Sequence, residues 1–285
     1  MKSITEYPLI AEGIEEQERL WKAVGLDVHQ LEQLLASPQY QKVEPVWVTD
    51  KKVMDAVEKV TGFGRQVGNK FEEGMVELGR IPTVTEYCEA VLPEVFLFWQ
   101  SEKPEGIEWG TEVINAVNNR NIRSYTANIN ELHCCLALKE LFPDWGIYTS
   151  NELDLLAGVD IVVETGQKRL FLHLYKNSRY SFIAYRKKQR RGGAKDLNGK
   201  FHRYYRNFEG DKSLMYEGNA AYVSETTKFI NGIPLFKLDW LENQLLLFDK
   251  FQQFGEPLKK SSKLAYMEKF LRELRVPKKT AVGGI

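Results

Sequence analysis

The chain has 285 residues, 43% of them hydrophobic and 27% charged, the ordinary composition of a soluble globular protein with one large or two modest domains. No apolar run approaches the ~20 residues of a membrane-spanning helix, and the N-terminal segment lacks the basic and apolar stretches of a secretory signal. Three cysteines, Cys88, Cys134 and Cys135, are odd in number and lack Cys-x-x-Cys spacing. They argue against a disulfide framework or a cysteine zinc site and favour a cytoplasmic protein.

Charge is divided along the chain, although the formal net charge is zero. Residues 1–109 contain 20 Asp and Glu against 11 Lys and Arg, whereas residues 168–206 contain 13 Lys and Arg against one acid, Asp196. Eight aromatic side chains lie among these cations. Cations attract phosphates and aromatic rings stack on bases, so this basic region predicts a nucleic-acid-binding surface. A solvated basic face is the plainer alternative.

The first 105 residues predict a helical N-terminal domain. Asp50 is the expected N-cap of one helix, and Thr83 or Thr85 is the expected N-cap of the last. The glycine-containing stretch 62–74 lacks the spacing of a phosphate-binding loop and predicts an ordinary loop. Apolar residues recur at helical spacing in four segments, namely 11–25, 26–37, 50–64 and 83–99.

Residues 106–285 predict an α/β (α+β) domain, a mixed sheet flanked by helices, after a polar linker at 100–110. Its centre is a hairpin of two strands, 158–164 and 169–176, joined by a tight turn. The other expected elements are a helix at 124–142, a strand at 145–151, a helix at 181–193, a strand at 220–225, a strand and helix within 233–251, and a basic amphipathic helix at 259–279.

Polar residues stand on this apolar hairpin. Asp160 lies on its first strand, while His173, Tyr175 and Lys176 lie at the end of the second, and Glu131 lies on the preceding helix. This order of elements resembles the PD-(D/E)XK nuclease superfamily over roughly residues 124–195. The elements are a helix with a glutamate, a Gly-x-Asp on a strand, a turn, and a strand that ends in a polar-x-polar pair. The resemblance implies a restriction-endonuclease-like core and metal-dependent hydrolysis of phosphodiesters.

The family motif maps unevenly onto this chain. By resemblance, Asp160 stands at the metal-binding aspartate, and Glu131 stands at a helical glutamate that completes the metal shell. His173 replaces the second carboxylate, and Tyr175 replaces the catalytic lysine. The resemblance therefore implies a site for Mg²⁺ or Mn²⁺ at Asp160, Glu131 and His173, with Tyr175 or Lys176 positioning the water. A histidine nitrogen suits Mn²⁺ better than Mg²⁺.

Strand alternation places His173 and Tyr175 on one face and Lys176 on the other. A β-bulge at Leu174 or Tyr175 would turn Lys176 toward the site. A basic residue from the next helix is the alternative, and nearby acids could replace the missing carboxylate: Glu152, Asp154 or Glu164. The structural reading makes Asp160 a turn or capping residue and pairs His173 with Tyr175 in the core.

The expected phosphate contacts are basic residues that follow the hairpin: Arg179, Arg186, Lys187, Lys188, Arg190, Arg191, His202, Arg203 and Arg206. The adjacent residues His133, Cys134 and Cys135 point in different directions on a helix, so they are interpreted as core filler.

The first functional hypothesis is a metal-dependent DNA endonuclease of restriction, phage defence or a mobile element. The alternative is a non-catalytic protein of the same fold that binds nucleic acid and docks a protein partner through the acidic N-terminal domain. In a third hypothesis, the acidic domain covers the basic face until DNA displaces it. The expected partners are DNA, or RNA in its place, and a second copy of the chain in a homodimer; no membrane partner is expected.

Overall fold

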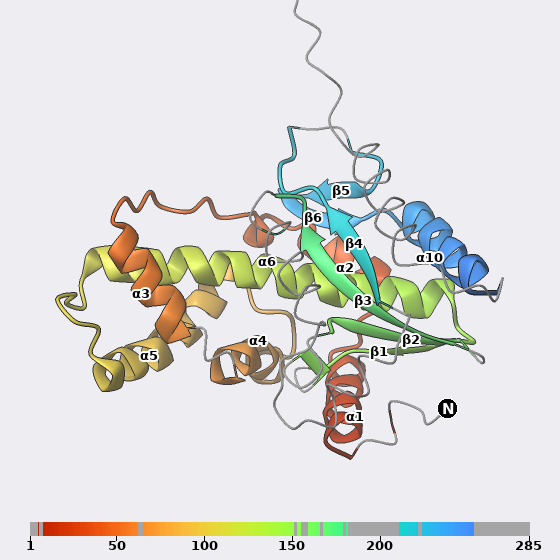
Figure 1. The fold of residues 1–285 in the computed structure, drawn as a ribbon, viewed down its shortest axis with the longest axis horizontal. Coiled ribbons are helices and arrows are strands. Elements are labelled where there is room, and N and C mark those ends of the chain that lie inside the picture. Colours follow the sequence, from red (N-terminus) through yellow and green to blue (C-terminus); the bar gives the residue numbers. More distant parts are fainter. Residues whose placement is uncertain are drawn as a thin grey trace, which may run out of the picture. The chain divides into compact units, whose positions relative to one another are not determined.

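A computed structural model describes nine stretches of the chain: residues 5, 8–61, 65–150, 153–154, 159–165, 168–178, 181, 211–221 and 224–253. The chain divides into two compact units, residues 1–243 and residues 244–285. The described part combines helices with a mixed sheet, which confirms the α/β class predicted from the sequence (Figure 1). None of its helices is long and apolar enough to cross a membrane.

The N-terminal helices follow the apolar periodicity of the sequence. Asp27 and Thr83 each cap a helix in a reciprocal capping box, in which the side chain three residues later bonds back to the cap backbone. The Asp50 carboxylate accepts from the N–H of Lys52, as expected of an N-cap. The helices are α1 (Pro8–Ala23), α2 (Val28–Leu35), a 3₁₀ turn (Pro38–Tyr40), α3 (Lys51–Thr61), α4 (Arg65–Leu78) and α5 (Val84–Glu102).

The loop expected at 62–74 is wrong, because most of this stretch belongs to α4. Its apolar residues explain the helix: Phe71 and Met75 are one turn apart and both are buried. The ring of Phe71 packs edge-on against Tyr87 and Tyr125, with centroids 6.1 and 5.8 Å away. Tertiary burial thus overrides the weak helix propensity of the glycines in α4.

Helix α6 (Thr111–Leu141) is the central element of the first unit. It starts well before the helix predicted at 124–142 and packs against α2, α3 and α5 as well as against β1 and β6. Figure 1 shows α3 and α5 beside its N-terminal half and the strands beside its C-terminal half. Helix α6 thus packs against helices that precede residue 105 and against strands that follow it, and the structure divides the chain after residue 243.

The main sheet has the order β1-β2-β3-β4, in which β1, β2 and β3 are antiparallel neighbours and β4 is parallel to β3. The strands predicted at 145–151, 158–164 and 169–176 are confirmed. The main-sheet strands are β1 (Gly146–Tyr148), β2 (Ile161–Thr165), β3 (Lys168–Lys176) and β4 (Asp211–Tyr216). A second sheet pairs β5 (Thr227–Ile230) with β6 (Ile233–Phe236), and α10 (Leu238–Gln253) follows.

Two of the later expectations change. The strand expected at 220–225 is wrong for its described residues, since 220–221 form a turn and 224–225 are not in a strand. The strands β4 and β5 were not predicted from the sequence. The helix predicted at 181–193, apart from Ser181, and the helix predicted at 259–279 lie outside the described residues.

Candidate functional site

Glu131 and Asp160 are brought together by a threonine that the sequence did not single out. Glu131 projects from α6, Thr149 directly follows β1, and Asp160 directly precedes β2. The Thr149 hydroxyl lies 2.6 Å from Oε1 of Glu131 and 2.7 Å from the carbonyl oxygen of Asp160. We call Glu131, Thr149 and Asp160 the acidic site. One hydroxyl thus ties a helix to the ends of two strands.

Asp160 is held by the backbone of the neighbouring strand. Its N–H donates to the carbonyl of Leu172 at 3.1 Å, and the N–H of Leu174 donates to its Oδ2 at 2.5 Å. The second bond fixes the direction of the carboxylate beside β3. It is also the kind of bond that a structural, end-capping aspartate makes.

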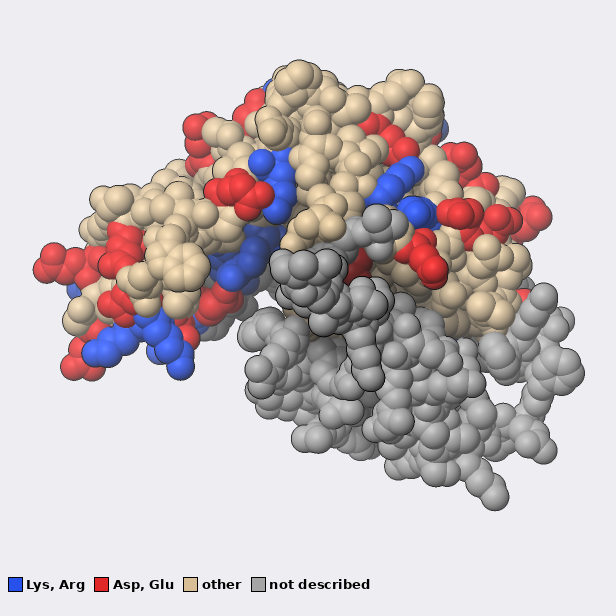
Figure 2. Space-filling view, turned by 90° about the horizontal axis from the view of Figure 1, so that it is seen from above, with Lys and Arg blue, Asp and Glu red and all other residues tan. Residues whose placement is uncertain are grey.

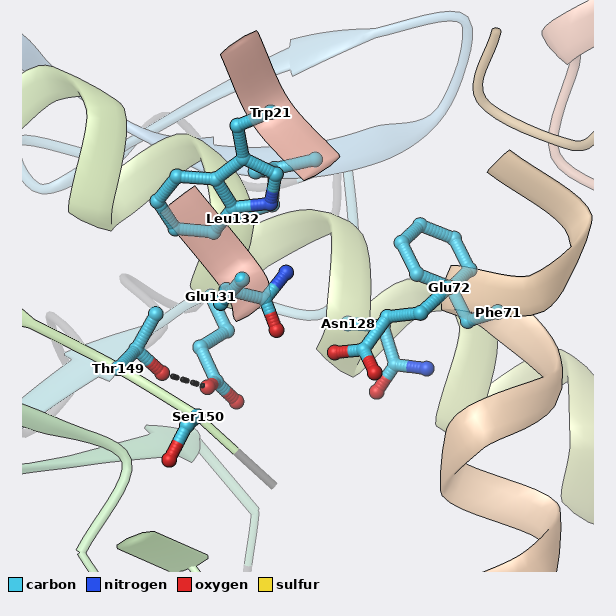
Figure 3. A pocket seen from close by; sticks show the side chains of 9 residues that line it. Trp21, Phe71, Glu72, Asn128, Glu131, Leu132, Thr149 and Ser150 are labelled. Carbon is cyan, nitrogen blue, oxygen red and sulfur yellow. Dashed lines mark hydrogen bonds between the residues drawn. The ribbon is translucent and has the colours of Figure 1, made fainter. Parts of the chain in front are cut away.

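Glu131 lines a small pocket of about 50 Å³ (Figure 3). Figure 3 shows its carboxylate turned toward Thr149 and Ser150, with Glu72 and Asn128 on the other side of the pocket. The space suits a cation or a few waters better than an organic ligand. Residues from α1, α4, α6 and the segment after β1 form its wall: Gln17, Trp21, Phe71, Glu72, Asn128, Glu131, Leu132, Thr149 and Ser150.

The surroundings of Glu131 disfavour the ionised form of its carboxyl group. Burial raises the pKa of the Glu131 carboxyl well above its usual range, and the negative charge of Asp160 raises it further. The Thr149 hydrogen bond opposes these two effects, and the smaller effects of the Asp154 and Glu72 charges raise the pKa of Glu131 a little more. A cation between these carboxylates would reverse the balance, since an opposite charge favours the ionised form.

His173 and Tyr175 lie on the face of β3 opposite to that of Lys176, as strand alternation requires. Lys176 lines a pocket together with Ile122 and Thr126 of α6. His173 is buried there, with its ring 6.3 Å from that of Tyr175. Within the described part of the chain, no group of three or more His, Cys, Asp or Glu side chains is placed to hold a metal ion.

Lys176 lies in a different pocket from the acidic site. β3 pairs with β4 residue by residue from Phe171 to Lys176, so this pairing contains no bulge that would redirect the lysine. Lys176 instead lines a larger pocket together with Lys42, Trp47 and Arg123, which we call the basic pocket. Lys176, the candidate catalytic lysine, therefore lines a different pocket from Glu131, a candidate metal ligand.

Glu164, Asp154 and Glu152, the three acids that could replace the missing second carboxylate, have different surroundings. Glu164 forms an ion pair with Arg169 across the hairpin, with Arg169 Nε donating to Oε1 at 2.5 Å. Asp154 is exposed, although its charge acts on Glu131. Glu152 and every predicted phosphate contact lie outside the described residues: Arg179, Arg186, Lys187, Lys188, Arg190, Arg191, His202, Arg203 and Arg206.

A second buried ionic group joins α2, α6 and β5. Cys134 and Cys135 are fully buried, which confirms them as core filler, but their neighbour His133 has a polar partner. His133 Nε2 lies 2.8 Å from Oε1 of Glu32, and Lys228 Nζ donates to the same oxygen at 2.6 Å. Burial lowers the pKa of His133, so its neutral ring donates through Nε2–H. These contacts lower the pKa of Glu32 to about 2, the His133 hydrogen bond most strongly.

Comparison with known proteins gives no relative from which a role could be transferred. No family model, curated protein or solved structure matches the chain significantly. The acidic site, the basic pocket and the charge pattern of the sequence are therefore the features that bear on function.

Proposed function

We propose that the chain is a divalent-cation-dependent nuclease in which Glu131 and Asp160 are the protein ligands of the cation. The observation that carries the proposal is the Thr149 hydroxyl, which contacts the Glu131 carboxylate and the backbone carbonyl of Asp160, together with the effect of the Asp160 charge on the pKa of Glu131. Further support comes from the mixed sheet and from α6, which supplies the glutamate immediately before the sheet. The proposed fold is accordingly restriction-endonuclease-like.

The residues of the acidic site fit Mg²⁺ or Mn²⁺. Two carboxylates are a usual protein contribution to a Mg²⁺ site, and waters supply the remaining ligands. A bound cation would neutralise charge on the scissile phosphate and activate a water. Thr149 orients the Glu131 carboxylate, and the Leu174 N–H orients that of Asp160. The proposed ligand set does not need His173 or Tyr175, because waters complete the shell of a Mg²⁺ ion held by two carboxylates.

The proposed substrate is nucleic acid, with DNA as the first choice. Its support is the basic, aromatic-rich sequence at 168–206, which directly continues β3. A polyanion would neutralise this region and gain stacking contacts from its aromatic rings.

The test is cleavage of supercoiled and single-stranded DNA, and of RNA, by the full chain with Mg²⁺ or Mn²⁺. Asp160→Asn keeps an oxygen that can accept from Leu174 N–H but removes the charge. We expect cation-dependent nicking that EDTA stops and that Asp160→Asn lowers by two or more orders of magnitude. Asp55→Asn, an exposed site on α3, is the matched control. Absence of cleavage by the wild type, or full activity of Asp160→Asn, would refute the nuclease.

A non-catalytic nucleic-acid-binding protein is the second candidate. The observation that favours it is that Lys176, the candidate catalytic lysine, lines the basic pocket and not the pocket of Glu131. Binding that weakens steeply with salt, without any nicking, identifies this second function in the same experiment.

A further inference from the structure

The basic pocket is a second hollow that shares no residue with the pocket of Glu131. Its volume is about 600 Å³, within the range typical of small-molecule sites. The segment 41–50, α3, the middle of α6 and the ends of β3 and β4 form its walls. Figure 2 shows Lys and Arg side chains in the middle of the face seen there, with Asp and Glu side chains both beside them and farther out.

Among the described residues, Lys176 differs from the other cations of this pocket in having no ion pair with a carboxylate. Lys42 Nζ lies 3.1 Å from Glu44, and Arg123 bonds to Glu58 at 2.5 Å, so these two cations are partly neutralised. No ion pair of Lys176 occurs among the described residues. Partial desolvation lowers the pKa of Lys176, and the charges of Lys42 and Arg123 lower it further, against a smaller opposing effect of the Glu44 charge. A bound anion would relieve this repulsion.

The Lys176 side chain crosses directly over Gly218, just beyond the end of β4. Glycine at this position leaves the crossing open, whereas a larger side chain would push the flexible end of the lysine aside. Lys176 is exposed, so its ammonium group is accessible to an anion in the pocket.

Trp47 supplies a flat apolar surface at the same pocket. Its side chain is 87% exposed, an unusual position for an indole, and the neighbouring Val46 is 56% exposed. The segment that carries them is anchored on α6, because the Asn119 amide accepts from Val46 N–H at 2.9 Å and donates to Val46 C=O at 2.6 Å. An anchored, exposed indole is a stacking platform for a planar ring.

We propose that the basic pocket binds a nucleotide 5′-phosphate, with the phosphate on Lys176 and the base stacked on Trp47. This ligand chemistry is shared by a free mononucleotide and by the phosphorylated 5′ end of a nucleic-acid strand. The inference goes beyond the nuclease proposal, because neither Glu131 nor Asp160 takes part in it.

The test is calorimetric titration of the full chain in EDTA, so that the acidic site plays no part. The probes are dAMP, deoxyadenosine, and a short oligonucleotide with and without a 5′-phosphate. We expect dAMP or the phosphorylated oligonucleotide to bind, and removal of the phosphate to weaken binding at least tenfold. Tighter binding of dAMP would identify a free mononucleotide as the natural ligand, and tighter binding of the phosphorylated oligonucleotide would identify a strand end.

Two variants locate the site, and a third serves as control. Lys176→Gln and Trp47→Ala should each weaken binding about tenfold, whereas Lys22→Gln, at the exposed end of α1, should leave it unchanged. Trp47 is mostly exposed, so its removal should not affect folding; unchanged thermal melting of both variants is the check. Failure of both phosphorylated probes to bind, equal binding of deoxyadenosine, or full affinity in both variants would overturn the proposal.

Discussion

Glu131 carries a carboxyl group whose charged form is disfavoured in the folded protein. Its folded pKa is raised above the usual value of 4.5, so ionisation costs stability as pH rises above 4.5 and through the folded pKa. Glu131→Gln removes that cost while leaving an oxygen for the Thr149 hydroxyl. We therefore expect this variant to melt higher than the wild type in EDTA at pH 7, and no higher at pH 4.

The control for this prediction is Glu140→Gln, which changes an exposed glutamate of the same helix. Addition of Mg²⁺ should stabilise the wild type and not Glu131→Gln, since only the wild type keeps both carboxylates. A Glu131→Gln variant that is less stable at pH 7 would contradict this account of the site.

Glu32 shows the opposite behaviour. Its pKa falls from 4.5 to about 2, so its stabilising effect is present above pH 4.5 and is lost as pH falls toward 2. A shift of this size corresponds to about 3 kcal/mol at neutral pH. Glu32→Gln should lower the free energy of unfolding by that order at pH 7, and the difference should shrink toward pH 2. Urea unfolding at several pH values measures it, with the exposed Glu12→Gln as control; a difference constant with pH would be inconsistent with it.

At the scale of elements, a helix or strand could be predicted from the sequence wherever its apolar residues show helical or strand periodicity. The hairpin of β2 and β3 and the helices α1, α2, α3 and α5 could be predicted in this way. α4 could not, because its glycines suggest a loop and its apolar stripe gains stability only from burial against Tyr87 and Tyr125. β4 could not either, since its place beside β3 depends on pairing across a long sequence separation.

The start of α5 could be narrowed to Thr83 or Thr85 from the sequence, and the structure selects Thr83. Its hydroxyl accepts from the N–H of Glu86 at 3.3 Å, and the Glu86 carboxylate accepts from the Thr83 N–H at 2.7 Å. Thr83→Ala should therefore lower the free energy of unfolding by about 1 kcal/mol. Thr85→Ala, at an exposed position in the first turn, should change it by less than about 0.5 kcal/mol. Equal effects in denaturant unfolding would show that the cap is not at Thr83.

At the scale of the whole molecule, the sequence indicated the carboxylates but not their surroundings. The resemblance of the hairpin and the preceding helix to the PD-(D/E)XK pattern suggested Asp160 and Glu131. Thr149, which links them, has no local signature, because its role depends on where β1 ends relative to α6. The separate pocket of Lys176 could not be predicted either. Strand alternation assigns the side chains of β3 to two faces but does not say what lies against each face.

The most direct test of the central claim is cation binding at the acidic site, measured by titrating Mn²⁺ into the full chain and following free Mn²⁺ by electron paramagnetic resonance. We predict a bound Mn²⁺ whose affinity rises with pH, because the cation must displace the proton that the raised pKa of Glu131 retains. Glu131→Gln and Asp160→Asn should each weaken binding at least tenfold, while Glu140→Gln should not. Mn²⁺ affinity that is absent in the wild type, or unchanged in both site variants, would contradict the account.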